Sequence, residues 1–197
     1  HSEYVKWNEY SCKSFRENLV GLDEIKIIGG EQERLVDGFK HGFYEIYNMW
    51  KSEKCNILFC GVDTYCLNRV NIFDKFENFM MFNYTDPSSN RDIQNYFNCD
   101  VRLYPHTMKQ EVWDVGLAMA EEWDYSSWDY EQYIYNKMLW SQGLSFDDCY
   151  RPDLAWQDVT VKENNNDIKV DEAGIIHFHG TRQIDRLFGR IAEIKGD

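Results

Sequence analysis

Apolar residues recur at steps of three and four along two stretches of the first third of the chain, which is the spacing of one helix face. The first stretch covers residues 5–19 and is followed by Gly21, a helix stop signal. The second covers residues 35–50 and is largely aromatic on its apolar face. We therefore expect two amphipathic helices, the second of which packs on a sheet.

Short apolar runs bounded by turn residues predict β-strands between and after these helices. The expected strands cover residues 24–28, 56–60, 79–82, 101–104, 155–161 and 174–178. The last two flank a polar loop at residues 163–167, which is typical of a hairpin. Two further helices are expected, one over residues 112–123 and one that begins at the N-cap candidate Asp129.

Strands and helices therefore alternate along the chain, and no linker rich in proline and glycine divides it. With 197 residues, 43% of them apolar and 16% aromatic, the chain has enough apolar surface for one ordinary domain with a sizeable core. We expect a single α/β domain over residues 1–197, in which about six strands form one mixed sheet.

The charge balance excludes one class of partner. The chain carries 34 acidic and 21 basic residues, which gives a net charge of −13 at pH 7. This charge repels a phosphate backbone, and no basic stripe offers a place for DNA, RNA or anionic lipid. An anionic small substrate needs a cation or a local arginine to cancel the field where it binds, so the acidity favours a metal.

The six cysteines form no C-x-x-C pair and lie mostly in apolar runs, which is typical of reduced core thiols. No stretch approaches the ~20 apolar residues that cross a membrane, and no signal peptide opens the chain. We therefore expect a reducing, cytoplasmic setting and no integral membrane segment.

Two strand ends carry the residues best suited to chemistry. Asp63 follows the apolar run 56–60, at the edge where ligands collect in an open α/β sheet. His177 and His179 share one strand face, because residues two apart on a strand point the same way. Together these side chains predict a site for one divalent cation. A solvated turn aspartate and hydrogen-bonded core histidines are the alternatives.

Arg182 follows the histidines after Gly180, and its planar fork suits phosphate because it can bond two oxygens at once. A surface ion pair with Asp185 is the alternative role. A cation beside an arginine is the arrangement expected of an enzyme that acts on a diphosphate.

Four blocks of the sequence, in order, resemble motifs of one enzyme family. The strand that ends in Gly61-Val62-Asp63, with Ile72-Phe73 shortly after it, resembles a strand that ends in Asp-x-Asp. Gly61 replaces the first aspartate of that motif. Asn98-Cys99-Asp100, with Trp123 behind it, resembles an Asn-Ala-Gly strand before a helix that ends in tryptophan.

The other two blocks lie later in the chain. Residues 131–136 match the spacing of an Asp-Gln-x-x-x-Asn helix that lines the donor sugar. Residues 177–180 with Arg182 match a His-aromatic-x-Gly motif followed by a basic residue. The chain thus resembles the nucleotide-sugar glycosyltransferases of the GT-A fold, in particular the retaining, UDP-sugar-using branch with the glycogenin and galactosyltransferase-like enzymes. It is also similar to viral members that build capsid glycans.

This resemblance implies a GT-A (Rossmann-like) three-layer α/β/α sandwich and transfer of a hexose from a UDP-sugar to a glycan or glycoprotein acceptor, with retention. It implies Mn²⁺ or Mg²⁺ held by Asp63 and His177. Glu131, Gln132 and Asp100 become the catalytic candidates, and Glu131 and Asp100 would orient the sugar. The implied donor contacts are Gly61, Val62, Asp63, Tyr65, Asn98, Cys99, His179, Gly180 and Arg182.

Two other functions stay open. A metal-dependent phosphodiester hydrolase can be built on Asp63, His177 and His179, although such sites normally recruit further ligands. A non-catalytic module that binds nucleotide-sugars would keep the fold without turnover, and the glycine at position 61 favours that alternative. In the glycosyltransferases that the chain resembles, a strand that contacts uracil precedes the opening helix. This sequence has too few residues before its first predicted helix for such a strand.

Overall fold

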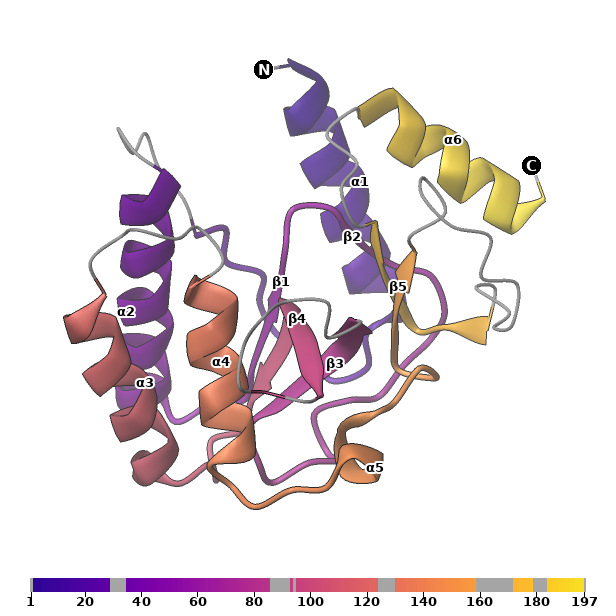
Figure 1. The fold of residues 1–197 in the computed structure, drawn as a ribbon. Helices are drawn as coiled ribbons and strands as arrows, with labels where there is room; N and C mark the ends of the chain where they lie inside the picture. Colours follow the sequence, from indigo (N-terminus) through magenta and orange to yellow (C-terminus); the bar gives the residue numbers. More distant parts are fainter. Residues whose placement is uncertain are drawn as a thin grey trace.

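The chain folds into helices and short strands, which Figure 1 shows for the computed structural model. The structure describes residues 2–28, 35–85, 93, 95–123, 130–158, 172–178 and 184–196. Its elements are α1 (Ser2–Asn18), α2 (Leu35–Glu53), β1 (Ile57–Cys60), β2 (Thr64–Cys66), β3 (Met80–Thr85), β4 (Tyr96–Tyr104), α3 (Gln110–Glu122), α4 (Tyr130–Trp140), α5 (Phe146–Cys149), β5 (Ala155–Asp158), β6 (Ile175–Phe178) and α6 (Ile184–Lys195). The expected α/β class is confirmed.

The strands form two three-stranded sheets. In the first sheet the order is β1-β4-β3, and both pairs are antiparallel. In the second sheet the order is β2-β6-β5, with β2 antiparallel and β5 parallel to β6. The expectation of one mixed central sheet in a three-layer sandwich is therefore wrong.

The division into two sheets has a local cause at the end of β1. Gly61 donates its N–H to the Asp100 carbonyl at 2.7 Å, which extends the pairing of β1 with β4. The chain then turns, and the Thr64 hydroxyl donates to the Gly61 carbonyl at 2.7 Å across the turn. β2 begins at Thr64 and pairs with β6 instead. Asp63 therefore lies where the two sheets meet.

Helices cover the two sheets separately. α3 and α4 pack on each other, α4 also contacts β4, and α2 stands beside them in Figure 1. The larger hydrophobic core contains residues of these helices and of the first sheet, and it extends to α1 and to the second sheet. α1 packs on β2 and on α6, and a smaller core that includes Trp7, Ile176 and Leu187 joins them.

α1 confirms the first predicted helix and is fixed to the turn that follows β1. The indole N–H of Trp7 donates to the Val62 carbonyl at 2.6 Å, and the Ser11 hydroxyl donates to the Thr64 carbonyl at 2.8 Å. Both side chains satisfy backbone acceptors that no neighbouring strand reaches. The helix therefore holds the turn on either side of Asp63.

Two predictions about strands are wrong. Residues 24–28 form no strand and pair with none of the described strands, and Ile27 is 73% exposed. β5 and β6 run parallel, so they cannot form the expected hairpin, because a parallel pair needs a crossover connection. The polar loop at 163–167 and the N-cap candidate Asp129 lie outside the described residues.

Three short or late elements were not predicted, namely β2, α5 and α6. β2 is only three residues long and α5 only four, which is too short for a periodic pattern. α5 begins at a capping box, in which the side chains of Ser145 and Asp148 each accept a hydrogen bond from the other residue's backbone N–H.

In the described ranges, no helix combines the length and the apolar character that crossing a membrane requires.

Candidate metal centre

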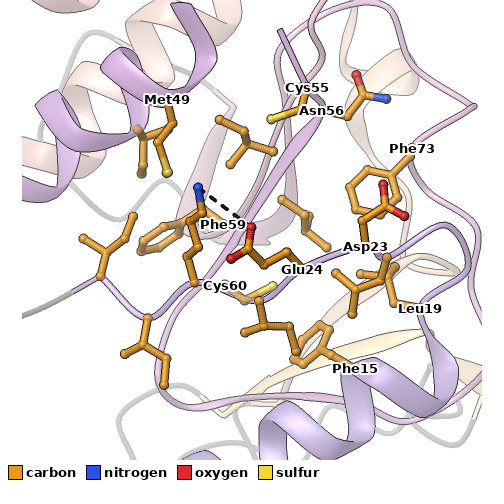
Figure 2. A pocket seen from close by; sticks show the side chains of 18 of the residues that line it. Phe15, Leu19, Asp23, Glu24, Met49, Cys55, Asn56, Phe59, Cys60 and Phe73 are labelled. Atoms are coloured by element: carbon orange, nitrogen blue, oxygen red, sulfur yellow. Dashed lines mark ion pairs between the residues drawn. The ribbon is translucent and has the colours of Figure 1, made fainter. Parts of the chain in front are cut away.

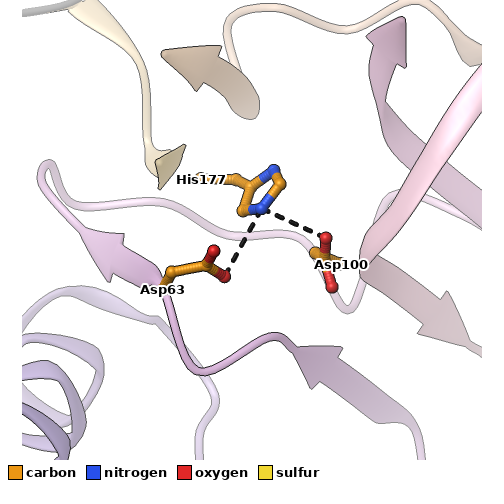
Figure 3. A group of neighbouring side chains, drawn as sticks. All are labelled: Asp63, Asp100 and His177. Atoms are coloured by element: carbon orange, nitrogen blue, oxygen red, sulfur yellow. Dashed lines mark ion pairs between the residues drawn. The ribbon is translucent and has the colours of Figure 1, made fainter. Parts of the chain in front are cut away.

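Three segments that are distant in the sequence converge where the two sheets meet (Figure 3). Asp63 comes from the turn after β1, Asp100 from the middle of β4, and His177 from β6. The His177 Nε2 atom lies 3.1 Å from Asp100 Oδ2 and 3.4 Å from Asp63 Oδ1. The structure therefore brings Asp63 and His177 together, as the metal hypothesis requires, and adds Asp100 to them.

Strand alternation explains how β6 presents His177. Ile176 and Phe178 point into the small core with α1 and α6, so His177 between them points the other way, toward the turn. Register completes the placement, because His177 pairs with Thr64, the residue after Asp63. The imidazole is almost fully buried, whereas the side chains of Asp63 and Asp100 are 26% and 34% exposed. The carboxylates thus form the open side of the cluster.

The charges of the cluster are strongly coupled. Burial by itself lowers the pKa of His177, but hydrogen bonds to Asp100 and Asp63 outweigh burial and raise this pKa to about 10. Burial likewise opposes ionisation of Asp100, yet the bond from His177 holds the pKa of Asp100 below its usual value. At neutral pH the His177 imidazolium therefore lies against the ionised carboxylate of Asp100.

The donor set fits a hard divalent cation. Ligand atoms on adjacent corners of a Mg²⁺-sized octahedron are ~3.0 Å apart, close to the two separations around His177 Nε2. All three donor atoms lie within 4.8 Å of one another. Two carboxylates and one imidazole suit Mn²⁺ or Mg²⁺ better than a soft metal. Residues 63, 100 and 177 are the one such group found among the described residues.

A second charged cluster lies beside the first, and its central residue, Arg102, was not predicted from the sequence. The guanidinium carbon of Arg102 lies 3.9 Å from the ring centre of Phe59 and 3.7 Å from that of Tyr135. Its Nη1 lies 3.4 Å from Oε1 of Glu131 on α4. Burial raises the pKa of Glu131, against the opposing effect of Arg102. The signal in the sequence was a charge between Val101 and Leu103.

β4 places Arg102 and Asp100 on one face, because they are two residues apart. The residues between and beside them on the strand lie in the large core: Cys99, Val101 and Leu103. Cys99, expected to contact the donor, therefore packs on the opposite face from Asp100. Asn98 is buried, and its side-chain oxygen accepts the N–H of Asp100 at 2.8 Å. Asn98 thus supports the strand that carries Asp100.

Tyr65, another expected donor contact, lies elsewhere. It is buried in the small core, where its ring stacks on Tyr10 at 5.1 Å and its hydroxyl accepts a bond from Lys195 at 2.9 Å. Alternation along β2 points Tyr65 away from the face that His177 shares with Thr64. The expected donor contact at Tyr65 is therefore replaced by packing.

The remaining expected residues divide into two sets. Gln132 lies on the first turn of α4 and is half-buried, and Val62 is 54% exposed beside Asp63. His179, Gly180 and Arg182 lie outside the described residues.

A cavity of about 970 Å³ runs along β1 (Figure 2), and the cluster residues Asp63, Asp100 and His177 are not among those that line it. Residues 21–28 form one wall, α1 and α2 contribute others, and Gly61, Val62 and Thr64 line the end nearest the cluster. Lys26, one of the lining residues, forms an ion pair with Glu53 at 2.8 Å and a second one with Glu24 at 3.9 Å, which Figure 2 draws as a dashed line. This space was not predicted, because residues 24–28 were expected to form a strand.

The chain was compared with protein-family models, with curated proteins and with solved structures. No family model, no curated protein and no solved structure matches it. The resemblance to GT-A glycosyltransferases therefore rests on the sequence blocks alone, and the geometry of the cluster is independent of it.

Proposed function

We propose that this chain is a divalent-metal-dependent glycosyltransferase that moves a hexose-type sugar from a UDP-sugar to a glycan acceptor. One observation carries the proposal: Asp63, Asp100 and His177 converge from three segments, beside a turn whose residues Gly61, Val62 and Thr64 line a large cavity. A cation site beside a cavity of ligand size is the arrangement that a nucleotide diphosphate donor requires. The order of the sequence blocks supports the same class.

In this proposal Asp63, Asp100 and His177 hold Mn²⁺ or Mg²⁺. The bound cation would neutralise the charge that develops on the leaving diphosphate. His177 takes part only after its imidazolium loses a proton, while the lowered pKa of Asp100 keeps that carboxylate ionised. Arg182 would supply a second positive charge to the diphosphate, as the resemblance implies.

Glu131 is the residue that we assign to the donor sugar. Its side chain is 15% exposed, and Arg102 holds it on the side of the sheet where Asp100 lies. A carboxylate held in this way can accept hydrogen bonds from sugar hydroxyls and fix the orientation of the ring. Gln132 follows it on the first turn of α4, so it would lie near the same sugar.

The cavity beside β1 would take the nucleoside. Its volume of about 970 Å³ is at the upper end of the ~300–1,000 Å³ typical of small-molecule sites. The walls are mainly apolar and suit a base, while the carboxylates of Asp23 and Glu24 can accept hydrogen bonds from ribose hydroxyls. Gly61 and Val62 at its end then lead from nucleoside to diphosphate.

The test is a release assay with the full chain, Mn²⁺ and a panel of UDP-, GDP- and CMP-sugars. Release of UDP that requires Mn²⁺ supports the proposal, provided that Asp63→Asn abolishes it. Asp114→Asn, on an exposed position of α3, is the matched control and should leave the rate unchanged. Cleavage of bis(p-nitrophenyl) phosphate without UDP release favours a hydrolase. Binding of UDP-sugars without release favours a non-catalytic module.

A further inference from the structure

The backbone conformation of Gly61 does not require a glycine, so another feature must explain the residue. The positive φ angles found among the described glycines belong to Gly21, Gly143 and Gly196, so Gly61 adopts a conformation open to any residue. A Cβ atom added at Gly61 would lie 2.8 Å from Oδ1 of Asp100 and 3.0 Å from its Cβ. Real Cβ atoms essentially never approach other atoms below 3.0 Å. The space beside Gly61 is therefore already filled by Asp100.

The same carboxylate takes part in the metal centre. Oδ1 of Asp100 leans over Gly61, while Oδ2 lies 3.1 Å from Nε2 of His177. The backbones of the two residues are hydrogen-bonded to each other, because the Gly61 N–H donates to the Asp100 carbonyl at 2.7 Å. Neither residue can move away from the other without breaking the end of the β1 and β4 pair.

We propose that positions 61 and 100 share a single carboxylate slot, and that the bare backbone at Gly61 is what allows Asp100 to enter the centre from β4. Gly61 is thus a positioning residue. The inference rests on the metal centre of the proposed function and deepens it, because it states which strand delivers the second carboxylate and what makes room for it.

The slot has a consequence that distinguishes it from mere close packing. A side chain at position 61 begins where the Asp100 carboxylate now ends, so an aspartate there would place its own carboxylate near the same point. Exchange of the two residues, Gly61→Asp with Asp100→Gly, should therefore rebuild the centre from the other strand. The partner substitution is to glycine because the Cβ of Asp100 is itself within 3.0 Å.

The experiment measures Mn²⁺ binding by isothermal titration calorimetry on the full chain. We expect Gly61→Ala and Asp100→Gly each to weaken Mn²⁺ affinity at least tenfold, and the exchanged double variant to return to within about threefold of wild type. The proposal is overturned if the double variant binds no better than Asp100→Gly, or if Gly61→Ala binds as wild type does.

A second readout needs no metal. Gly61→Ala should lower Tm by about 3–10 °C in the wild-type chain but not in the Asp100→Gly background, where the slot is empty. Gly189→Ala is the control, because a Cβ on this exposed helical glycine meets nothing within 4 Å, and it should not lower Tm. An equal loss in both backgrounds overturns the slot. Failure of the wild-type chain to bind Mn²⁺ overturns the metal centre, and the Tm comparison then still decides the slot.

Discussion

Two charged clusters lie on the same face of β4, and they differ in whether their basic side chain can lose its proton and bind a metal. In the first, the imidazolium of His177 lies between the partly exposed carboxylates of Asp63 and Asp100. In the second, Arg102 is 1% exposed, stacked between two rings and paired with Glu131. A protonated histidine can release its proton to solvent and bind a metal through the freed ring nitrogen, whereas an arginine stays protonated and keeps its charge.

The comparison shows how neighbouring positions on one strand acquire different roles. The cluster around Asp100 holds two acidic side chains against one histidine and has an open side, so it suits a divalent cation. The cluster around Arg102 is neutral and closed, so it is suited to fixing the position of Glu131. The predictions below test this division, beginning with the largest expected effect.

Arg102→Met should destabilise the protein most. The substitution keeps much of the side-chain length but leaves Glu131 largely buried without its cation, and breaking a buried pair in this way costs about 3–5 kcal/mol. The measurement is the free energy of unfolding from urea titrations. Arg190→Met, which breaks the surface pair with Glu193, should cost less than about 1 kcal/mol. Equal losses in the two variants would show that the Arg102 pair behaves as a surface pair.

His177→Asn should make the stability of the metal-free protein less dependent on pH. The folded pKa of about 10 lies above the unfolded value of 6.5, so His177 stabilises fully below pH 6.5 and its contribution is lost as pH rises toward 10. We expect the variant to be less stable than wild type at pH 6 by on the order of 3 kcal/mol, with the gap closing by pH 10.

Urea titrations at pH 6, 8 and 10 with EDTA present measure this difference. A gap that stays constant, or that widens as pH rises, contradicts the charge assignment of His177. His106→Asn is the matched control, since that histidine is exposed and bonds Asn56 outside the cluster, and it should show no comparable change with pH.

The sequence predicted the part of the first cluster that follows from local pattern. Asp63 was recognised because it follows an apolar run, and His177 because it shares a strand face with His179. Asp100 was predicted as a catalytic candidate that orients the sugar and not as a metal ligand, since its nearness to Gly61 depends on the register of β1 with β4. The pairing of two strands that are some 40 residues apart in the sequence cannot be predicted from either strand alone.

The errors in the fold have the same origin. Alternation at residues 24–28 predicts a strand, but a strand also needs a partner edge, and none of the described strands provides one there. The second sheet was missed because β2 has only three residues and is defined by its pairing with β6. Arg102 was missed because the rings that enclose it come from β1 and α4, which are separate in sequence.

Mn²⁺ affinity should rise with pH in the first cluster. Because His177 must lose its proton to coordinate, we expect affinity to increase up to tenfold per pH unit between pH 6.5 and 8.5, about 1.4 kcal/mol per unit. Calorimetry in two buffers of different ionisation enthalpy counts the protons released. Asp63→Asn should bind Mn²⁺ at least tenfold more weakly at each pH. An affinity that does not change with pH would mean that His177 is not a ligand.

Glu131→Gln should have the smallest effect on the metal, and this separates the two clusters most sharply. Glu131 bonds Arg102 and is not among the three residues whose ligand atoms converge, so we expect Mn²⁺ affinity to change less than threefold. If Glu131 orients the donor sugar, the same variant should release UDP at least tenfold more slowly in the panel assay. Asp63→Asn should lose both properties. If the Glu131→Gln variant lost Mn²⁺ binding, this result would show that the two clusters act as one metal site along β4.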